Sequence, residues 1–406
     1  MADSSTSKLN LSTEPIQIAA EDARELQITN QATAEDGSLT QITFMNPKLY
    51  VAAADGHIHV LEKYDEIHVQ LTPKKNTVLH VAAQFGRADC VKWILQLPSP
   101  SSLLQQPNEK DDTALHLAAR EGHLTVVKNL IDAAKQPKRD LEGGSTAVCK
   151  VMLRMTNGDK DTALHEAVRH HHPKVVKLLI QEDPEFTYGA NTEGNTPLYI
   201  AAERGFRDLV HMILDNCSSP AHDGVNGRTA LHAAVILNDE AMTRKILTWN
   251  PALTKQLDAN GWSPLHFAAY VGCHRTIVRQ LLKNSDRYVI YLGVKDHGIG
   301  KRTALHIAAS RGHVEIVKLL VSDSPDCCEK VDDEGNNVLH LIMQEKKILL
   351  TSGLSNIRWL WVRGLTFEKN GEGETPSIYF TTVLSYLRKC LALVLFSLSL
   401  LLGLQR

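Results

Sequence analysis

The stretch YVIYLGVKDHGIGKRTALHIAA, residues 288–309, has the outline of a phosphate-binding loop. In such a loop, backbone N–H groups and a lysine hold phosphates at the start of a helix. The spacing does not fit this chemistry. Gly293 and Gly298 match G-x-x-x-x-G, but Ile299 and Gly300 stand where Lys and Ser or Thr are required, and Lys301 comes only after them. The stretch is therefore predicted to be a loop that binds no nucleotide.

The string LHEAVRHHHP, residues 164–173, is the strongest candidate for a metal site. A zinc protease uses H-E-x-x-H, because i, i+4 spacing places both ligands on one helical face. Here His165 and His170 are five residues apart, so the second ring points about 140° away from the first. His171 and His172 fall in a turn between helices. The seven cysteines contain no C-x-x-C pair, so neither a metal nor another cofactor is predicted.

The remaining composition argues against catalysis and against nucleic-acid binding. The chain has no D-H-H-C acyltransferase motif, no H-R-D and D-F-G kinase pair, and no G-x-S-x-G nucleophile elbow. Its formal net charge of −2 lacks the basic excess that a nucleic-acid partner requires. We therefore predict a non-enzymatic protein.

One phrase recurs along most of the chain, and the structural unit that it forms must position the candidate side chains. It reads TALHLAA at residue 113, and counterparts begin at residues 47, 77, 162, 196, 229, 263, 303 and 337. The successive spacings are 30, 36, 49, 34, 33, 34, 40 and 34 residues. A period near 33 that carries T-P-L-H-x-A is the signature of ankyrin repeats. The sequence predicts an all-α ankyrin-repeat solenoid of about nine helix pairs over residues 45–350.

The residue pattern within one unit favours the same structure. Thr113 suits an N-cap, and Leu115 with the two alanines of the phrase forms the apolar face of a short helix. Gly122 suits the left-handed residue that ends it. One helix pair cannot bury its own apolar face, so neighbouring units must stack. The histidine of each phrase is predicted to be structural, bonding its Thr and a neighbouring loop; these residues are His80, His116, His165, His232, His266, His306 and His340.

The longest break in the period, residues 133–161, is a candidate partner-binding loop. It carries the basic residues Lys138, Arg139, Lys150 and Arg154 against fewer acids. Long connections in compact repeat arrays are often functional. A tolerated surface insertion is the alternative interpretation.

The two ends of the chain differ from the array. Residues 1–44 are polar and are predicted to be a mostly disordered arm, and residues 351–376 to be a linker or ragged cap. Within residues 377–406, the segment CLALVLFSLSLLLGL is apolar all round and favours a membrane anchor, although its helix would span only about 22 Å. The anchor candidates are Leu391, Val394, Phe396, Leu400 and Leu404. A tail that self-associates or packs on another element is the alternative.

Four longer strings indicate which ankyrin-repeat family the sequence resembles. MLRMTNGDKDTALHEAV, DTALHEAVRHHHPKVVKLLIQEDPEFTYGAN, TPLYIAAERGFRDLV and YLGVKDHG are similar to the plant ankyrin–transmembrane family typified by the accelerated-cell-death proteins. That resemblance implies an array facing the cytosol at the plasma membrane or endoplasmic reticulum, and a role in defence and cell-death signalling. The family's Pro-Gly-Gly motif and several spans are missing after residue 350. We therefore expect a truncated or spliced member.

The combined prediction is a protein–protein interaction scaffold that binds partners through its concave face and loop tips. Those partners include, as a hypothesis, full-length relatives with which it competes. Two alternatives stay open. One is a multi-span receptor or channel-like protein, which the missing spans argue against. The other is a soluble cytoplasmic adaptor for a separate enzyme.

Overall fold

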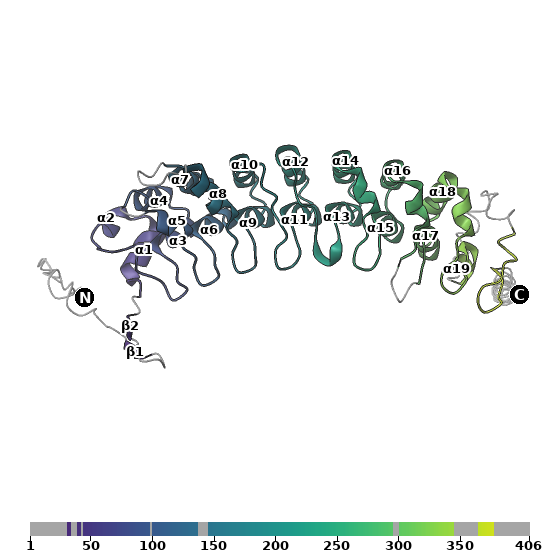
Figure 1. Ribbon diagram of the computed structural model, residues 1–406, viewed down its shortest axis with the longest axis horizontal. Coiled ribbons are helices and arrows are strands. Elements are labelled where there is room, and N and C mark those ends of the chain that lie inside the picture. The colour runs from purple at the N-terminus through teal and green to yellow at the C-terminus, as the bar shows by residue number, and fades with distance from the viewer. Residues whose placement is uncertain are drawn as a thin grey trace, which may run out of the picture.

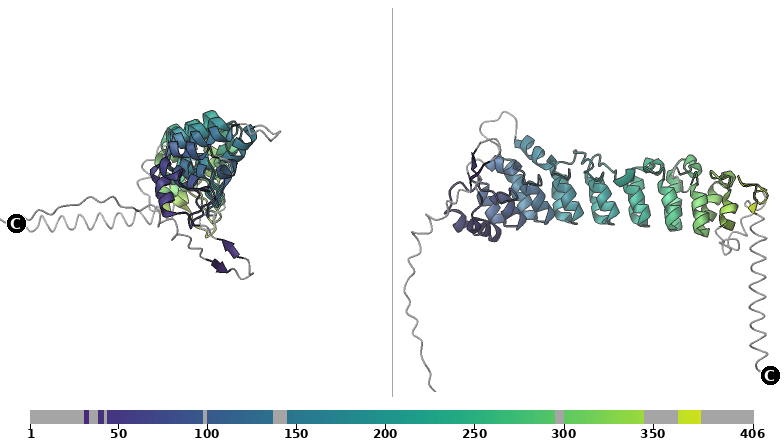
Figure 2. Two further views of the ribbon diagram at one scale, coloured as in Figure 1. Left: turned by 90° about the vertical axis from the view of Figure 1, so that its left-hand side faces the viewer. Right: turned by 90° about the horizontal axis from the view of Figure 1, so that it is seen from below.

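The computed structural model describes residues 31–33, 39–41, 44–97, 100–136, 145–294, 300–344 and 364–376. Two parallel rows of helices run along the molecule, and loops project from one row (Figure 1). The view from below shows the helices stacked side by side along its length (Figure 2). The all-α prediction is confirmed, and the array forms a gentle arch with the loops on its inner side.

Each of the first eight repeats contributes one helix to each row, and the described part of the ninth contributes an inner helix. The inner row consists of α1 (Pro47–Asp55), α3 (Val78–Gln84), α6 (Ala114–Arg120), α9 (Ala163–Arg169), α11 (Pro197–Glu203), α13 (Ala230–Ile236), α15 (Pro264–Val271), α17 (Ala304–Arg311) and α19 (Val338–Gln344). The outer row consists of α2 (Ile58–Leu61), α4 (Ala88–Ile94), α7 (Leu124–Ala134), α10 (Pro173–Glu182), α12 (Arg207–Asn216), α14 (Glu240–Trp249), α16 (Arg275–Asn284) and α18 (Val314–Asp323). Short helices follow several outer helices: α5 (Pro100–Gln105), α8 (Ser145–Arg154), η1 (Val225–Gly227), η2 (Pro251–Lys255), η3 (Arg287–Tyr291) and η4 (Pro325–Glu329).

The repeated phrase accounts for the inner row. Thr77 precedes α3, and its hydroxyl accepts a hydrogen bond from the His80 N–H at 3.3 Å, as an N-cap does. Pro197 and Pro264 occupy first helical positions, where no N–H is lost. The alanines of the phrase are almost wholly buried because inner helices lie directly against one another. Stacking thus supplies the core that a single helix pair lacks.

The glycine that follows several of the inner helices also lets neighbouring repeats interlock. Gly272 ends α15 in the left-handed conformation, with φ of +80°. A Cβ at this position would lie 2.5 Å from the ring of His313 in the next repeat. The His313 Nε2 lies 3.3 Å from the carbonyl oxygen of Tyr270. Glycine is therefore needed here both for its backbone angle and for the space that the next repeat fills.

The long insertion between the third and fourth repeats is partly helical. Its second half forms α8, which packs against α7. Arg154 lies at the end of α8, and its Nε donates to the buried Asp183 at 2.6 Å. The interpretation of residues 133–161 as one long loop is wrong for this half, because α8 has its own buried side chains, including Met152.

The segment expected to be a linker after the ninth repeat is ordered in its last part. Asn370 Oδ1 accepts hydrogen bonds from the backbone N–H groups of Glu372 and Glu374 at 3.1 and 2.9 Å. Asn191 accepts the same two bonds in the loop before α11. His340 Nε2 contacts the Glu374 carbonyl oxygen at 3.0 Å. Residues 370–374 therefore form a further projecting loop bonded to the ninth repeat, which agrees with the cap alternative of the prediction and not with a linker.

The structure describes part of the N-terminal arm and none of the C-terminal tail. The arm contains an antiparallel pair of strands, β1 (Gln31–Thr33) with β2 (Leu39–Gln41), which the prediction of a mostly disordered arm did not include. Residues 377–406, with the five predicted anchor residues, lie outside the described residues. Among the helices that the structure does describe, none is both long and apolar enough to cross a membrane.

Candidate functional site

The repeated histidines lie at the junctions between repeats. His80 is fully buried; its Nδ1 lies 2.8 Å from the Thr77 hydroxyl, and its Nε2 lies 3.0 Å from the carbonyl oxygen of Asp112 in the next loop. The Thr77 backbone N–H also donates to Nδ1, which assigns the proton to Nε2. The same pair of contacts, to a hydroxyl and to a carbonyl oxygen of the next loop, recurs at His116, His165, His232 and His266. At His340, the Asn337 amide oxygen takes the place of the hydroxyl. His306 keeps the Thr303 contact, but its Nε2 has no partner among the described atoms.

The histidine triplet contacts three different groups. His170 Nδ1 lies 3.0 Å from the Glu166 carbonyl oxygen, and His172 Nε2 lies 2.9 Å from the Arg120 carbonyl oxygen. His171 takes the left-handed position with φ of +55° and contacts Asp208 at 3.0 Å. Within the described ranges, no three His, Cys, Asp or Glu side chains are grouped to hold a metal ion.

One inner helix breaks the rule that the residue after L-H or L-Y is apolar. The fourth repeat carries Glu166 at this position, and its side chain is only 4% exposed. The other eight repeats carry Val51, Val81, Leu117, Ile200, Ala233, Phe267, Ile307 and Leu341. Burying a carboxylate costs free energy unless charges and hydrogen bonds compensate it. Glu166 is therefore the feature of the inner face that packing alone does not explain.

Arg120 supplies the first compensation and comes from the preceding repeat. Its Nη2 and Nε lie 2.6 and 3.1 Å from the two Glu166 carboxylate oxygens. The same guanidinium donates to both oxygens of the buried Asp112 at 2.9 and 3.1 Å. Burial lowers the pKa of Arg120, but the hydrogen bonds that it donates to Glu166 and Asp112 outweigh this effect, and the pKa is raised overall. Arg120 therefore remains charged and links the two repeats.

Arg169 supplies the second compensation from within the same helix as Glu166. Its Nη1 lies 2.6 Å from Asp161 and 3.5 Å from Glu166. Asn191, in the next loop, donates to Asp161 at 2.9 Å. Burial raises the pKa of Asp161, but the hydrogen bonds from Arg169 and Asn191 outweigh it, and the pKa is lowered. The carboxylate of Asp161 therefore stays ionised.

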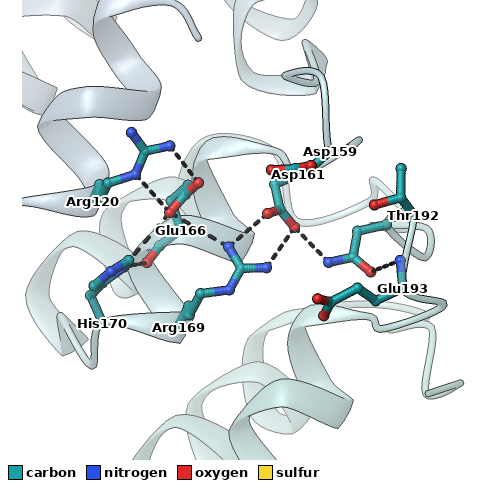
Figure 3. Close-up of a pocket in the computed structure, with 9 residues that line it drawn as sticks. Arg120, Asp159, Asp161, Glu166, Arg169, His170, Thr192 and Glu193 are labelled. Carbon is teal, nitrogen blue, oxygen red and sulfur yellow. Dashed lines mark hydrogen bonds and ion pairs between the residues drawn. The ribbon is translucent and has the colours of Figure 1, made fainter. Parts of the chain in front are cut away.

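These side chains border a hollow of about 360 Å³ on the inner face, which we call the Glu166 pocket (Figure 3). Figure 3 shows Glu166 between Arg120 and Arg169, with Asp161 facing Arg169 from the neighbouring loop. The full lining is Arg120, Asp159, Asp161, Glu166, Arg169, His170, Asn191, Thr192 and Glu193. Four carboxylates thus face two guanidinium groups, a formal net charge of −2 with histidine neutral.

A second cluster of side chains, the Tyr270 cluster, lies three repeats further along the inner face. Trp262 contacts Phe267 and Tyr270 with ring centroids 5.1 and 5.5 Å apart. The Cζ of Arg311 lies 3.8 Å from the centroid of the Tyr270 ring, and that of Arg228 lies 5.1 Å from the Phe267 ring. Tyr270 is 41% exposed. The cluster combines aromatic and arginine side chains, the residue types most often found at binding hot spots.

The predicted partner loop is only partly visible in the structure. Lys138 and Arg139 lie outside the described residues. Lys150 and Arg154 both face Asp183, at 4.0 and 2.6 Å, and the Arg154 guanidinium also lies over the Phe186 ring at 4.7 Å. These two residues therefore hold α8 on the array. Sequence reasoning missed Glu166 and Tyr270, although a comparison of the nine phrases letter by letter marks Glu166 at once.

One known protein family matches the chain, and its model matches four successive stretches of the array. The family model described as "Ankyrin repeats (3 copies)" matches residues 49–140, 141–223, 215–291 and 289–354. These ranges cover most of the chain and, except for the first two residues of α1, all nine inner helices that the structure describes.

Individual relatives come from distant organisms. An ankyrin repeat protein of Fowlpox virus is 35% identical over 31% of this chain and 37% of its own. Protein ACCELERATED CELL DEATH 6 of Arabidopsis thaliana is 27% identical over 59% of this chain and 38% of its own. The chain thus matches less than two-fifths of the length of either relative. The crystal structure of the human ASB11 ankyrin repeat domain is 22% identical, with a TM-score of 0.44, over 60% of this chain and 99% of that one.

Proposed function

Because the chain belongs to the ankyrin-repeat family, we propose that it is a non-enzymatic scaffold that holds a segment of a partner protein against its inner face. Ankyrin arrays generally act as protein-binding surfaces, since stacked repeats create an extended concave face. The only family matched along the chain is this one, and no catalytic domain is identified in it.

The Tyr270 cluster is the observation that carries the proposal. An aromatic side chain with 41% of its surface in solvent gains by being covered, and Arg311 stacked on it restricts its motion before a partner arrives. Phe267, Tyr270 and Arg311 of the cluster lie on inner helices, where side chains vary from repeat to repeat, and its other members lie in the loops before α13 and α15. The buried Thr–His pairs beneath it are instead repeated almost unchanged. Variable exposed residues on a constant support are typical of a recognition surface.

A differential capture experiment tests this proposal. The full chain, tagged at its N-terminus, is compared with a Tyr270→Ser/Arg311→Ser variant as bait in extracts of the source cells. The matched control is Tyr288→Ser, which removes a 70% exposed tyrosine in η3, outside the cluster. Proteins that bind the parent chain and the control, but not the double variant, support the proposal. Identical capture by all three baits would reject the inner face as the binding surface.

The cellular role that we propose is regulation of plant defence and controlled cell death. The similarity to Protein ACCELERATED CELL DEATH 6 over 59% of the chain supports it, together with the strings that resemble its family. The test is genetic: loss of the chain should change the timing of lesion formation after infection. An unchanged defence response in plants lacking the chain would reject this role and leave the scaffold function standing.

We also propose that the chain is attached to a membrane with its array facing the cytosol. The apolar run of residues 390–404, beside Arg388 and Lys389, supports this. The full chain and a version ending at Pro376 should be fractionated, and the pellets extracted with carbonate. Resistance of the full chain alone supports an anchor. If both versions are soluble, the array works as a cytoplasmic binding protein.

A further inference from the structure

The Glu166 pocket has features that folding does not require. The neighbouring repeats place isoleucine, leucine or another apolar residue at the Glu166 position and still stack. A buried ion pair is often no more stabilising than an apolar replacement of similar size. The Arg120–Asp112 and Arg169–Asp161 pairs would also persist without Glu166. The carboxylate is thus an addition to a fold that is already complete.

The rim of the pocket carries negative charge that the protein leaves largely uncompensated. Asp159 and Glu193 occupy equivalent positions in two adjacent loops, and both are exposed. The loops are joined by a hydrogen bond from the Thr192 N–H to the Asp159 carbonyl oxygen at 2.9 Å, which keeps the two carboxylates on one side of the hollow. Asp159 forms no ion pair with any residue in the described ranges. Glu193 accepts a hydrogen bond from the Asn195 amide at 3.1 Å, and its charge helps to raise the pKa of Arg169 without a direct ion pair between them.

Resting on the proposed scaffold function, we infer that the Glu166 pocket receives a basic side chain, arginine or lysine, from the bound partner segment. The pocket combines a hollow of about 360 Å³, a net charge of −2 and two exposed carboxylates at its mouth. Its own guanidinium groups are occupied, because Arg120 and Arg169 are each paired with two carboxylates. An anionic ligand would meet net repulsion, whereas a cation pairs with Asp159 and Glu193.

The chain offers a matched control for this inference. Glu334 and Glu372 occupy the same position in the two last described loops, and Glu334 accepts the Asn336 amide at 3.0 Å, just as Glu193 accepts Asn195. A Glu334→Gln/Glu372→Gln variant therefore loses the same two charges as Asp159→Asn/Glu193→Gln, but far from the pocket. Both variants change exposed side chains, so both should fold.

The probe is a short fluorescein-labelled peptide of alternating glycine and arginine, and its counterpart has citrulline in place of each arginine. Citrulline keeps the shape of arginine and removes its charge. Binding to the full chain is followed by fluorescence anisotropy at about 50 mM salt, where exposed charges are weakly screened. We expect the arginine peptide to bind and the citrulline peptide to bind at least about tenfold more weakly. The Asp159→Asn/Glu193→Gln variant should bind the arginine peptide about fivefold or more weakly than the parent chain does.

The outcomes separate this inference from the scaffold function. An equal loss in both double variants, or equal binding of the citrulline peptide, overturns the inference, since the pocket would then not be selective for a cation. In the capture experiment from cell extracts, the Tyr270→Ser/Arg311→Ser variant is expected to lose partners. If the Asp159→Asn/Glu193→Gln variant still captures all of those partners, the inference fails while the scaffold function stands. If no inner-face variant changes capture, the proposed function itself fails.

Discussion

Acidification is expected to destabilise the array through its repeated histidines. Burial lowers the pKa of His80, His165, His232, His266 and His306 from 6.5 to about 4. In His80 the contacts of both ring nitrogens fix the neutral form, whereas His306 keeps only the contact of its Nδ1. An unfolded chain would instead take up protons near pH 6.5. The folded state therefore binds fewer protons than the unfolded state between about pH 6.5 and pH 4.

The sign and size of the effect follow from this difference. The free energy of unfolding is unaffected by these groups above about pH 6.5, falls as the pH drops, and levels off below about pH 4. Between about pH 7 and pH 5, each imidazole lowers the free energy of unfolding by about 2 kcal/mol, and five together by about 9 kcal/mol. That loss is comparable to the whole stability of a typical domain.

Urea unfolding followed by circular dichroism at the two pH values and constant ionic strength measures the change. His232→Gln removes one imidazole whose Nε2 lies 3.1 Å from the Trp262 carbonyl oxygen. The variant is expected to be less stable at both pH values, but its loss between about pH 7 and pH 5 should be smaller by about 2 kcal/mol. An unchanged loss in His232→Gln would refute the reasoning.

Three further outcomes are expected. In urea titrations, Gly272→Ala should lower the free energy of unfolding by about 2 kcal/mol or more, because φ is +80° and the His313 ring occupies the space of a Cβ. The control Gly189→Ala should change the free energy of unfolding by less than about 1 kcal/mol, because no atom lies within 4 Å of the added Cβ. Glu166→Ile should fold with a stability within about 1 kcal/mol of the parent, and a larger loss would show that the carboxylate is structural. In a Cys390→Ser background, the six cysteines of the array are buried and should react with a thiol reagent only after unfolding, a result that prompt labelling would contradict.

The repeat architecture could be predicted from the sequence because each unit is specified locally. Thr113, the alanines and Gly122 fix one helix and its end, and nine copies in register fix the stack. The projecting loop of residues 370–374 was missed because its Thr375-Pro376 is not followed by L-H-x-A-A. The signal that could have revealed it is N-x-E-G-x-T-P, which residues 370–376 share with residues 191–197.

The candidate site was harder to predict because its partners come from different repeats. Glu166 is unusual within its phrase, but Arg120 lies 46 residues earlier and meets it only through stacking of α6 on α9. The helix α8 was missed because the uneven spacing favoured an irregular insertion. Arg154 holds α8 in place by its bond to Asp183, the C-cap residue of α10 in the following repeat, and no local sequence pattern indicates this contact.

Photocrosslinking from the inner face tests the central claim most directly. Benzoylphenylalanine would replace Tyr270, which is 41% exposed in its cluster, or Tyr288, which is 70% exposed in η3, in the full chain expressed in its source cells. If the inner face is the binding surface, irradiation yields a discrete protein adduct from position 270 and none from position 288. Adducts from position 288 alone, or equal adducts from both positions, would contradict a scaffold that binds partners through its inner face.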